Sequence, residues 1–498
     1  AGFLALGLFS QAVHNNSHNE QMYVAAGYLL NHSERLYQDF AFVQTPYTPL
    51  IYALAFRLSG GFYLLTAKLV NFGFFAVAAA LIYLITRRET RDMVFSLTLL
   101  ALFLANYYLL RTVIEASNYT IPMACSLGAY YLFVRSLDSR RRSVMFFLAG
   151  VLLAVAVGAK LYYATLAVPF GLAALAYPRR ASLRSRIGAG ALPLVAGTVA
   201  GALPLLYYAA RDWDRFAFNN LGYHLLNAQW REANGSTATM TWSSKLDTAR
   251  DLLANPSYLL IVAWLALAVA VVLAQQNKIR RSDVLSCSVV LSGLLTATAL
   301  LTAFTPRPLF PQYFAMPIPF ALALMAALYA QMLPPYRRTL RQSAVIAAIL
   351  VTITVLPRHT GSLRSALQGD DRWAGTEAVE VSRFIRDAIE TSATSSGSPG
   401  KILTLSPVYA IESDLPIYPE LATGSFVFRI GDLLSQEERE RYHATSVSTI
   451  SDLLDADPPA AILIGDEGDL ETPLLDFAQT HNYVPYGDEL AGGRLFIR

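Results

Sequence analysis

Long apolar segments recur over the first 357 residues of the chain, separated by short polar stretches. A helix needs about 20 apolar residues to cross a hydrocarbon core of about 30 Å. Eleven segments approach that length, and we expect each to span a membrane, the first being truncated where the sequence starts. They are 1–13, 62–86, 93–110, 120–134, 144–158, 162–177, 188–209, 257–274, 283–303, 314–333 and 343–357.

The segment 46–59 is also apolar, but it is short, carries two prolines near its start and contains Arg57. We expect it to form a helix that lies along the membrane surface. The five loops on one side then hold seventeen lysines and arginines, whereas the longer loops opposite hold ten. Because an excess of basic residues marks the cytoplasmic side, the opposite loops are expected to face outward.

Three longer regions then face outward, namely 14–61, 210–256 and 358–498. The last has a stretch rich in Ser, Gly and Pro at 391–400, followed by short apolar runs that alternate with acidic, helical segments. Such alternation predicts strands and helices of a small α/β domain of about 100 residues. We therefore expect an all-α polytopic membrane domain over residues 1–357 and an external, periplasmic α/β domain over residues 358–498.

Composition agrees with a membrane protein, since 54% of the residues are hydrophobic and only 15% are charged. These values exclude disordered, collagen-like and disulfide-framework proteins. A net charge of +3 gives no indication of a nucleic-acid partner. Five lysines against thirty-four arginines are typical of a GC-rich bacterial genome, so we expect the inner membrane of a bacterium. Cys125 and Cys287 lie in apolar runs and are expected to be buried hydrophobic residues.

Ionisable residues near bilayer depth are energetically costly and are therefore candidates for function. Four of them gather at the outer ends of predicted spans, and snorkelling to the lipid headgroups is the alternative for each. They are Lys68, Glu115, Lys160 and Arg307. Carboxylates beside cations at one membrane face suit sugar transfer from an anionic lipid carrier, because the acceptor hydroxyl needs a base and the departing phosphate needs a cation.

The first external region adds Glu20 at the start of an amphipathic helix. His14 and His18 are four residues apart beside it, a spacing that could hold a metal ion if a third ligand were fixed nearby. Asp39 is expected to cap a turn. In the last region, the acidic stretch 465–471 could bind a cation or form a solvated loop.

The order of these motifs resembles the C-type (GT-C) glycosyltransferases, in the bacterial group related to protein O-mannosyltransferases and the lipid A aminoarabinose transferase. NEQMYVAAGYLL follows the first span; LYQDF, a proline-led helix, IEASNY, GAKLYY and PQYFAMPIP come after it. The resemblance covers residues 1–357 and implies inverting transfer from a polyprenyl-phosphate sugar at the periplasmic face, without a required metal or other cofactor.

The resemblance also implies roles for several of these residues. It implies Glu20 as the catalytic base, Glu115 as a second acid that orients the base or the acceptor, and Lys68 as the ligand of the donor phosphate. Lys160 and Arg307 are further candidates for that phosphate. The family often has Asp-Glu where this chain has Asn19-Glu20, so the base is expected one position later. The expected substrate contacts are His18, Asn118, Tyr163, Tyr313 and His224.

Two other functions fit the pattern less well. A flippase or transporter of lipid-linked sugars would place polar groups near the midplane, often in paired repeats, and no inverted repeat is visible in this sequence. An envelope polysaccharide polymerase or ligase would use arginines of a large outer loop, and the region 210–256 holds four. These are Arg211, Arg215, Arg231 and Arg250. The acceptor could be a glycan, a glycolipid or a protein.

Overall fold

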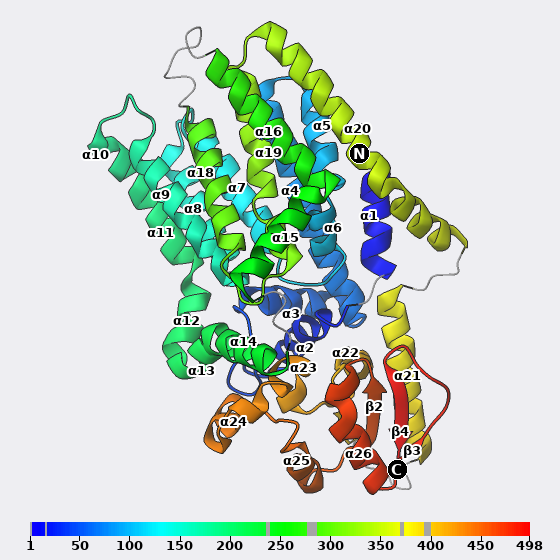
Figure 1. The fold of residues 1–498 in the computed structure, drawn as a ribbon. Coiled ribbons are helices and arrows are strands. Elements are labelled where there is room, and N and C mark those ends of the chain that lie inside the picture. The colour runs from blue at the N-terminus through cyan, green and yellow to red at the C-terminus, as the bar shows by residue number, and fades with distance from the viewer. Residues whose placement is uncertain (1, 15–16, 236–239, 276–285, 369–372, 393–399) are drawn as a thin grey trace.

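A computed structural model describes residues 2–14, 17–235, 240–275, 286–368, 373–392 and 400–498. The chain forms a bundle of helices and a smaller domain at one end of it (Figure 1). Most of the predicted loop 275–282, the start of the span 283–303 and most of the stretch 391–400 lie outside the described residues.

The bundle helices run mostly side by side (Figure 1), and shorter 3₁₀ and π segments are written η. In order, they are α1 (Gly2–His14), α4 (Tyr63–Thr90), α5 (Met93–Leu104), α6 (Tyr107–Val113), α7 (Thr120–Ser136), α8 (Arg142–Ala159), η1 (Leu161–Leu166), α9 (Ala167–Ala176), α10 (Leu183–Arg186), η2 (Ile187–Ala191), α11 (Leu192–Gly201), α12 (Leu203–Arg211), α15 (Trp242–Ala254), α16 (Pro256–Ala274), α18 (Cys287–Ala303), η4 (Pro311–Ala315), α19 (Ile318–Gln331) and α20 (Pro334–Gln368).

The chain is a multi-pass membrane protein. Within the described residues, five helical stretches are long and apolar enough to cross a membrane, and two bent helix pairs would raise that number to seven. Three shorter apolar helical stretches accompany them, Gly2–His14, Leu161–Ala176 and Cys287–Ala303. The total of eleven spans stays a prediction.

Two of the predicted spans are not single straight helices. The span 93–110 bends by 63° between α5 and α6, and the span 188–209 bends by 52° before α12. At the first bend the Asn106 side chain caps α6 by accepting hydrogen bonds from two backbone N–H groups. At the second, Pro204 has no N–H to continue the helical hydrogen bonding. Sequence hydropathy alone does not register either break.

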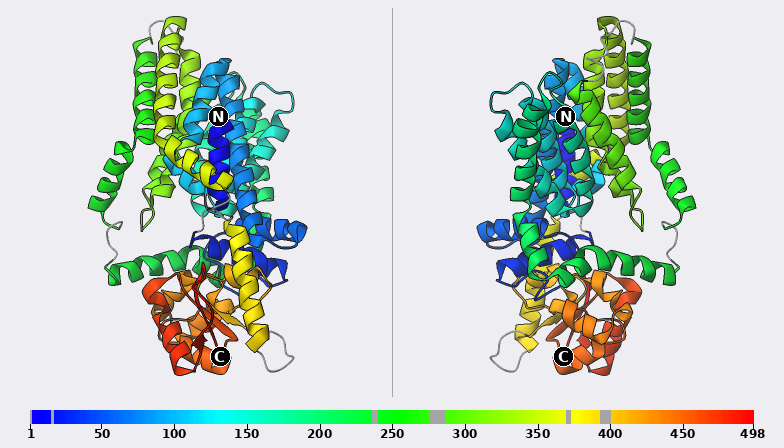
Figure 2. Two further views of the ribbon diagram at one scale, coloured as in Figure 1. Left: turned by 90° about the vertical axis from the view of Figure 1, so that its right-hand side faces the viewer. Right: turned by 90° about the vertical axis from the view of Figure 1, so that its left-hand side faces the viewer.

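A layer of shorter helices lies across the end of the bundle, between it and the small domain (Figure 2). Its members are α2 (Glu20–Asn31), α3 (Tyr47–Ser59), α13 (Trp213–Ala217), η3 (Phe218–Gly222) and α14 (Tyr223–Ala233). The predicted helix at 46–59 is present as α3, which ends at Gly60 in the left-handed conformation that glycine adopts readily. Its position along a membrane surface stays a prediction.

The small domain contains a four-stranded sheet in the order β1-β2-β4-β3. β1 and β2 are parallel, and the other pairs are antiparallel. The strands are β1 (Ile402–Leu403), β2 (Ala461–Gly465), β3 (Val484–Pro485) and β4 (Gly493–Ile497). The surrounding helical segments are α21 (Ala374–Ser392), α22 (Val408–Ile411), η5 (Pro419–Leu421), α23 (Ser425–Phe428), η6 (Gly431–Leu433), α24 (Gln436–Tyr442), α25 (Ile450–Ala456), η7 (Gly468–Glu471) and α26 (Thr472–Thr480).

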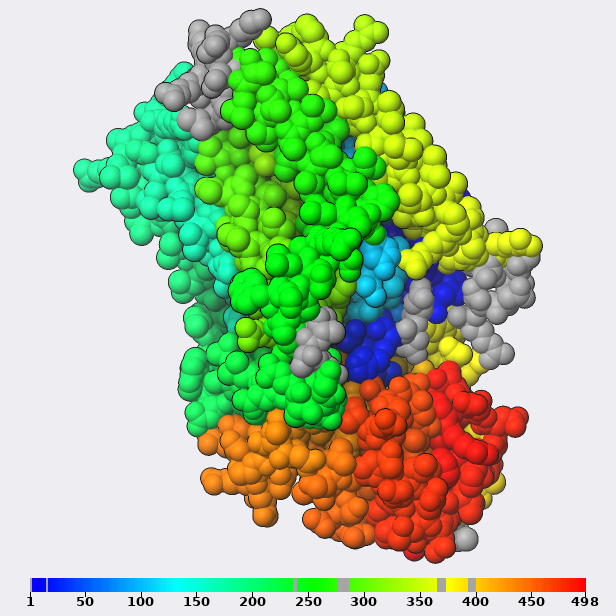
Figure 3. All heavy atoms as spheres, in the orientation of Figure 1, coloured from blue at the N-terminus to red at the C-terminus, as the bar shows by residue number. Residues whose placement is uncertain are grey.

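The helix α20 runs on past residue 357, where the membrane domain is predicted to end. It continues through Pro357 to Gln368. The predicted boundary between the two domains stays a prediction. α21 then contacts α4 and α1 as well as β4. The small domain is therefore packed directly on the bundle, and the space-filling view shows it covering one end (Figure 3).

Candidate functional site

Glu20 and Lys68 form an ion pair in the interior of the protein. Lys68 Nζ lies 2.5 Å from Glu20 Oε1, and the side chains are 1% and 0% exposed. The backbone N–H groups of Ala116 and Ser17 donate to the two carboxylate oxygens of Glu20, at 2.6 and 3.2 Å. Glu20 is the first residue of α2, where the helix dipole favours a negative charge. These donors offset the cost of burying its charge.

Asn71 fixes the loop that follows α6 against this pair. It lies one turn after Lys68 on α4 and is fully buried. Its Nδ2 donates to the carbonyl oxygens of Thr112 at 3.3 Å and Glu115 at 2.5 Å, and its Oδ1 accepts a hydrogen bond from the Thr120 hydroxyl. The loop that carries the second carboxylate is therefore held by one asparagine of the helix that carries Lys68.

Glu115 differs from Glu20 in being partly exposed. Asn19 Nδ2 donates to its Oε2 at the long distance of 3.4 Å. Burial raises the pKa of the Glu115 carboxyl above its ordinary value, and the negative charge of Glu20 raises that pKa further. A carboxylate that substrate can reach and that holds a proton more tightly than usual has the properties of a general base.

Lys160 connects α8 to η1 and reaches the same loop from the other side. Its Nζ donates to Asn118 Oδ1 at 2.7 Å and lies 3.7 Å from the centroid of the Tyr119 ring. Burial lowers the pKa of Lys160 to about 7, an effect that the negative charge of Glu115 opposes. Among the described residues, no carboxylate lies within ion-pair distance of this ammonium group.

Aromatic rings extend from Lys160 towards η4. Lys160 Nζ lies 5.2 Å from the centroid of the Tyr162 ring, which contacts the Tyr313 ring edge-on at 6.0 Å. Tyr163, the expected substrate contact, stacks on Tyr162 but belongs to the hydrophobic core of the bundle. The contacts therefore favour Tyr162 over its neighbour as the residue that faces the site.

His224 and Arg307 lie at the edge of this arrangement. The ring of His224, on α14, is open to solvent, yet the protein around it and the charge of Lys160 lower its pKa to about 4. Arg307 is exposed in the loop after α18. Within the part of the chain that the structure describes, no hydrogen bond or ion pair joins Arg307 to Glu115 or Lys160.

The two histidines that could hold a metal ion have separate partners. His14 Nδ1 bonds to the backbone carbonyl of Ser10 at 2.6 Å. His18 forms an ion pair with Glu467 and stacks on Phe426, both in the small domain. In the described segments, no group of three His, Cys, Asp or Glu residues lies close enough to hold a metal ion. Asp39 closes a turn by binding Arg35.

The small domain also holds the helices that carry the buried pair. Gln21, next to Glu20, accepts a hydrogen bond from the backbone N–H of Val408 at 2.9 Å. The Glu412 carboxylate accepts from the first two N–H groups of α4, at 3.0 and 2.6 Å. Burial raises the pKa of Glu412 to about 7. The small domain thus fixes where α2 and α4 begin.

The acidic stretch 465–471 is largely exposed, but some of its residues take part in this contact. Its Glu467 binds His18, and its Glu471 accepts hydrogen bonds from the backbone N–H groups of Gly465 and Glu467 at 2.8 and 2.9 Å. Asp466 accepts a hydrogen bond from Ser406 at 3.0 Å. Its acidic groups therefore fix the loop itself and join it to the first external region.

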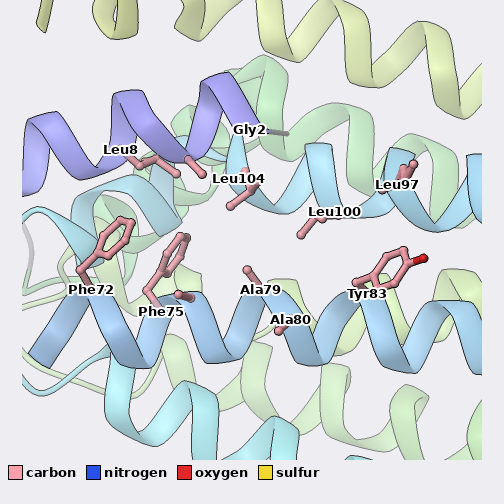
Figure 4. A pocket seen from close by; sticks show the side chains of 12 residues that line it. Gly2, Leu8, Phe72, Phe75, Ala79, Ala80, Tyr83, Leu97, Leu100 and Leu104 are labelled. Carbon is pink, nitrogen blue, oxygen red and sulfur yellow. The ribbon is translucent and has the colours of Figure 1, made fainter. Parts of the chain in front are cut away.

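An apolar cavity of about 470 Å³ lies between α1, α4 and α5. On α4 it is lined by Phe72, Phe75, Ala79 and Tyr83, and α5 and α1 close the other side (Figure 4). These α4 positions continue the helical stripe on which Lys68 lies, because each is three or four residues beyond the last. The cavity is suited to a hydrocarbon chain.

No family model and no curated protein matches the sequence. Solved structures do resemble the chain. The crystal structure of ArnT from Cupriavidus metallidurans bound to undecaprenyl phosphate has a TM-score of 0.62 at 12% identity, and the match covers 99% of this chain and 96% of that one. ArnT in the apo state gives a TM-score of 0.60 at 12% identity with the same coverage.

An oligosaccharyltransferase from Archaeoglobus fulgidus tethered to an acceptor peptide gives a TM-score of 0.49 at 10% identity, over 99% of this chain and 73% of that one. The likeness to ArnT extends over nearly the full length of both chains. The chain therefore shares its overall fold with ArnT, which confirms the predicted fold class.

Proposed function

We propose that the protein is a membrane glycosyltransferase that moves a sugar from a polyprenyl-phosphate donor to a glycan, lipid or protein of the bacterial cell envelope, at the periplasmic face of the inner membrane. The observation that carries the proposal is the single network of Glu20, Lys68, Glu115 and Lys160 at one end of the bundle. The shared fold supports it, because ArnT has been solved with undecaprenyl phosphate bound.

The proposed reaction is a displacement with inversion at the anomeric carbon of the sugar. The acceptor hydroxyl oxygen forms a bond to that carbon, and the bond from the carbon to the phosphate oxygen breaks. The lipid phosphate leaves with the electron pair of the broken bond. A carboxylate takes the hydroxyl proton, and a cation stabilises the charge that develops on the phosphate.

We assign the base to Glu115 and a positioning role to Glu20, which reverses the order expected from the sequence. Glu20 has no exposed surface and already accepts hydrogen bonds from Lys68 and two backbone N–H groups. An acceptor hydroxyl would have to displace one of these donors to reach it. Glu115 is partly exposed, its hydrogen bonds come from the side chains of Asn19 and Ser17, and the pKa of its carboxyl is raised.

The same comparison favours Lys160 as the ligand of the donor phosphate. The ammonium group of Lys68 is held by Glu20, whereas that of Lys160 has only neutral neighbours within hydrogen-bonding distance among the described residues. An approaching phosphate would raise the pKa of Lys160 and keep it charged. Asn118 and Tyr162 would border the phosphate and the sugar, and His224, Tyr313 and Arg307 stay candidate contacts at the rim.

The apolar cavity along α4 supports a lipid-linked donor, because a prenyl chain needs an apolar surface that continues away from the charged groups. The reaction as written needs no cofactor, since lysine supplies the positive charge. Transfer measured after chelation of divalent metals tests that part of the proposal: unchanged activity agrees with it, and loss that only added metal restores contradicts it.

The proposal is tested by sugar transfer in membrane vesicles that contain the wild-type chain, Glu115→Gln or the control Glu34→Gln. Glu34 is an exposed carboxylate of the first external region. Each sample receives labelled polyprenyl-phosphate sugars and an extract of envelope glycans, lipids and proteins. We expect transfer by the wild type and Glu34→Gln, and none by Glu115→Gln. Labelled lipid that changes leaflet without any transfer would identify a flippase and overturn the proposal.

A further inference from the structure

Arg429 of the small domain reaches into the layer of helices at the end of the bundle. It follows α23 directly and is 9% exposed. Its Nη2 donates to the Tyr223 hydroxyl of α14 at 2.9 Å, and its guanidinium lies 5.7 Å from the centroid of the Trp230 ring and 4.9 Å from that of Phe426. The two parts of the protein thus share one buried cation.

Arg231 brings a second guanidinium to the same place. It lies on α14, next to Trp230, and sits over the Phe310 ring at 5.5 Å from the centroid. Burial lowers the pKa of Arg231, and the positive charge of Arg429 lowers that pKa further. Arg429 lies over the ring of Trp230, the neighbour of Arg231, so two like charges gather around one segment of α14. This arrangement costs free energy unless an anion balances it.

Within the described residues, no carboxylate forms an ion pair with either arginine. The partners of Arg429 are a tyrosine hydroxyl and aromatic faces, and that of Arg231 is an aromatic face. The nearby acid Glu467 is bound by His18. Aromatic faces hold a guanidinium in place without neutralising it, so its N–H donors stay available for an anion.

These arginines connect to the proposed transfer site through a continuous run of rings. Phe310, under Arg231, contacts Tyr313 at 5.9 Å, and Tyr313 contacts Tyr162 at 6.0 Å. Tyr162 in turn lies 5.2 Å from Lys160 Nζ. An anionic group held by the arginines would therefore border the site where the sugar is transferred.

We propose that Arg231 and Arg429 form an anion-binding site for a phosphate or carboxylate group, built from both the helix layer and the small domain. The planar fork of a guanidinium matches the oxygens of either group. The group belongs either to the acceptor or to the donor lipid, and that part of the inference rests on the proposed function. The prediction that the site binds a free anion does not depend on the proposed function.

The test is the thermal unfolding midpoint of the purified full chain during titration with inorganic phosphate, at fixed pH and ionic strength with chloride as the balancing anion. We expect the midpoint to rise with phosphate for the wild type, and the rise to be lost in Arg429→Gln and in Arg231→Gln. Arg429→Lys should retain a weaker response, because it keeps the charge but not the fork.

Arg441→Gln is the matched control. Arg441 also links the small domain to the helix layer, through an ion pair with Asp214 at 2.6 Å, but it lies at the exposed edge of the contact. We expect its phosphate response to equal that of the wild type. A wild type that does not respond to phosphate overturns the inference, and so does an Arg429→Gln variant that responds like the wild type.

Addition of saturating undecaprenyl phosphate then identifies the source of the group. Loss of the response to free phosphate would assign the site to the donor phosphate. A response that persists would assign it to an anionic group of the acceptor, and Arg429→Gln should then raise the KM for acceptor but not for donor. Absence of sugar transfer in every sample would count against the proposed function while the phosphate titration still decides whether the anion site exists.

Discussion

Two acid–lysine couples lie in one network, and they differ in almost every physical respect. Glu20 and Lys68 touch directly and have essentially no exposed surface. Glu115 and Lys160 influence each other electrostatically but do not form an ion pair, and Glu115 is partly exposed. In the first couple the carboxylate and the ammonium group neutralise each other, whereas in the second couple both groups can still interact with a substrate. Residue type alone therefore does not separate a structural acid from a reactive one.

The difference follows from where each couple lies in the fold. Glu20 is the first residue of α2, and Lys68 lies in the first two turns of α4. The small domain holds the start of α2 through a hydrogen bond to Gln21 and the start of α4 through hydrogen bonds to Glu412. Glu115 and Lys160 lie in connections between bundle helices, where loops place side chains towards a site. The closed couple is expected to maintain the shape of the site, and the open couple to carry out the chemistry.

The largest expected effect comes from Glu115→Gln. Removing a general base typically lowers the rate by about 10²–10⁴-fold, and glutamine keeps the size of the side chain and its hydrogen bond with Asn19. We expect kcat for sugar transfer to fall by that factor while the thermal unfolding midpoint and the affinity for undecaprenyl phosphate stay near wild-type values. A kcat within a few-fold of the wild type would remove Glu115 from the role of base.

Breaking the closed couple should act on stability instead. Lys68→Met leaves the Glu20 charge buried without its partner, which typically costs about 3–5 kcal/mol. The double variant Glu20→Gln/Lys68→Met leaves no buried charge and should regain most of that loss, as measured by thermal or denaturant unfolding in detergent. Asp138→Asn is the control, because its exposed ion pair with Arg88 should contribute only about 0–1 kcal/mol. If the double variant lost more stability than Lys68→Met alone, the two charges would not stabilise each other.

A smaller effect is expected from Lys160→Met. The loss of one charged ligand removes an interaction of about 1.5–3 kcal/mol, so the KM for the donor should rise about tenfold or more. The KM for the acceptor should hardly change. Donor and acceptor titrations of the transfer rate separate these two quantities. If Lys68→Met raised the KM for the donor and Lys160→Met did not, the phosphate would belong to the closed couple.

The smallest effect concerns the dependence of kcat/KM on pH. Glu115 must be deprotonated to act as a base, so the rate should rise as pH increases through its raised pKa. Lys160 must be charged to bind phosphate. Its pKa in the free enzyme is lowered to about 7, so kcat/KM should fall again above that pH. Since the charge of Glu20 raises the pKa of Glu115, Glu20→Gln alone should move the acid limb to lower pH. A limb that stays in place or moves up would contradict that coupling.

The sequence predicted the architecture well because the apolar pattern is strong and local. Long apolar runs became helices, and Lys68, Glu115 and Lys160 could be singled out as ionisable residues near their ends. The bends at Asn106 and Pro204 were missed, since a break of one or two residues does not change hydropathy over a span. The length of α20 was underestimated, because its residues after Pro357 are mostly polar and do not continue the apolar pattern.

The division of roles within the site could not be predicted in the same way. The burial of Glu20 depends on Lys68, 48 residues away, and the contact of Arg429 with Tyr223 spans 206 residues. Periodicity does not encode contacts between such distant segments. Asn71 carried a detectable signal, as a polar residue one turn beyond Lys68 in an apolar helix. Nothing in the sequence distinguishes Tyr162 from Tyr163 as the residue that faces the site.

The central claim is that the open couple performs the transfer and the closed couple maintains the site. The most direct test is kcat for sugar transfer by Glu115→Gln and by the folded double variant Glu20→Gln/Lys68→Met in the same vesicles. The account predicts that the double variant stays within about tenfold of the wild type, while Glu115→Gln loses about 10²-fold or more. An inactive but folded double variant beside an active Glu115→Gln would contradict it and return the role of base to Glu20.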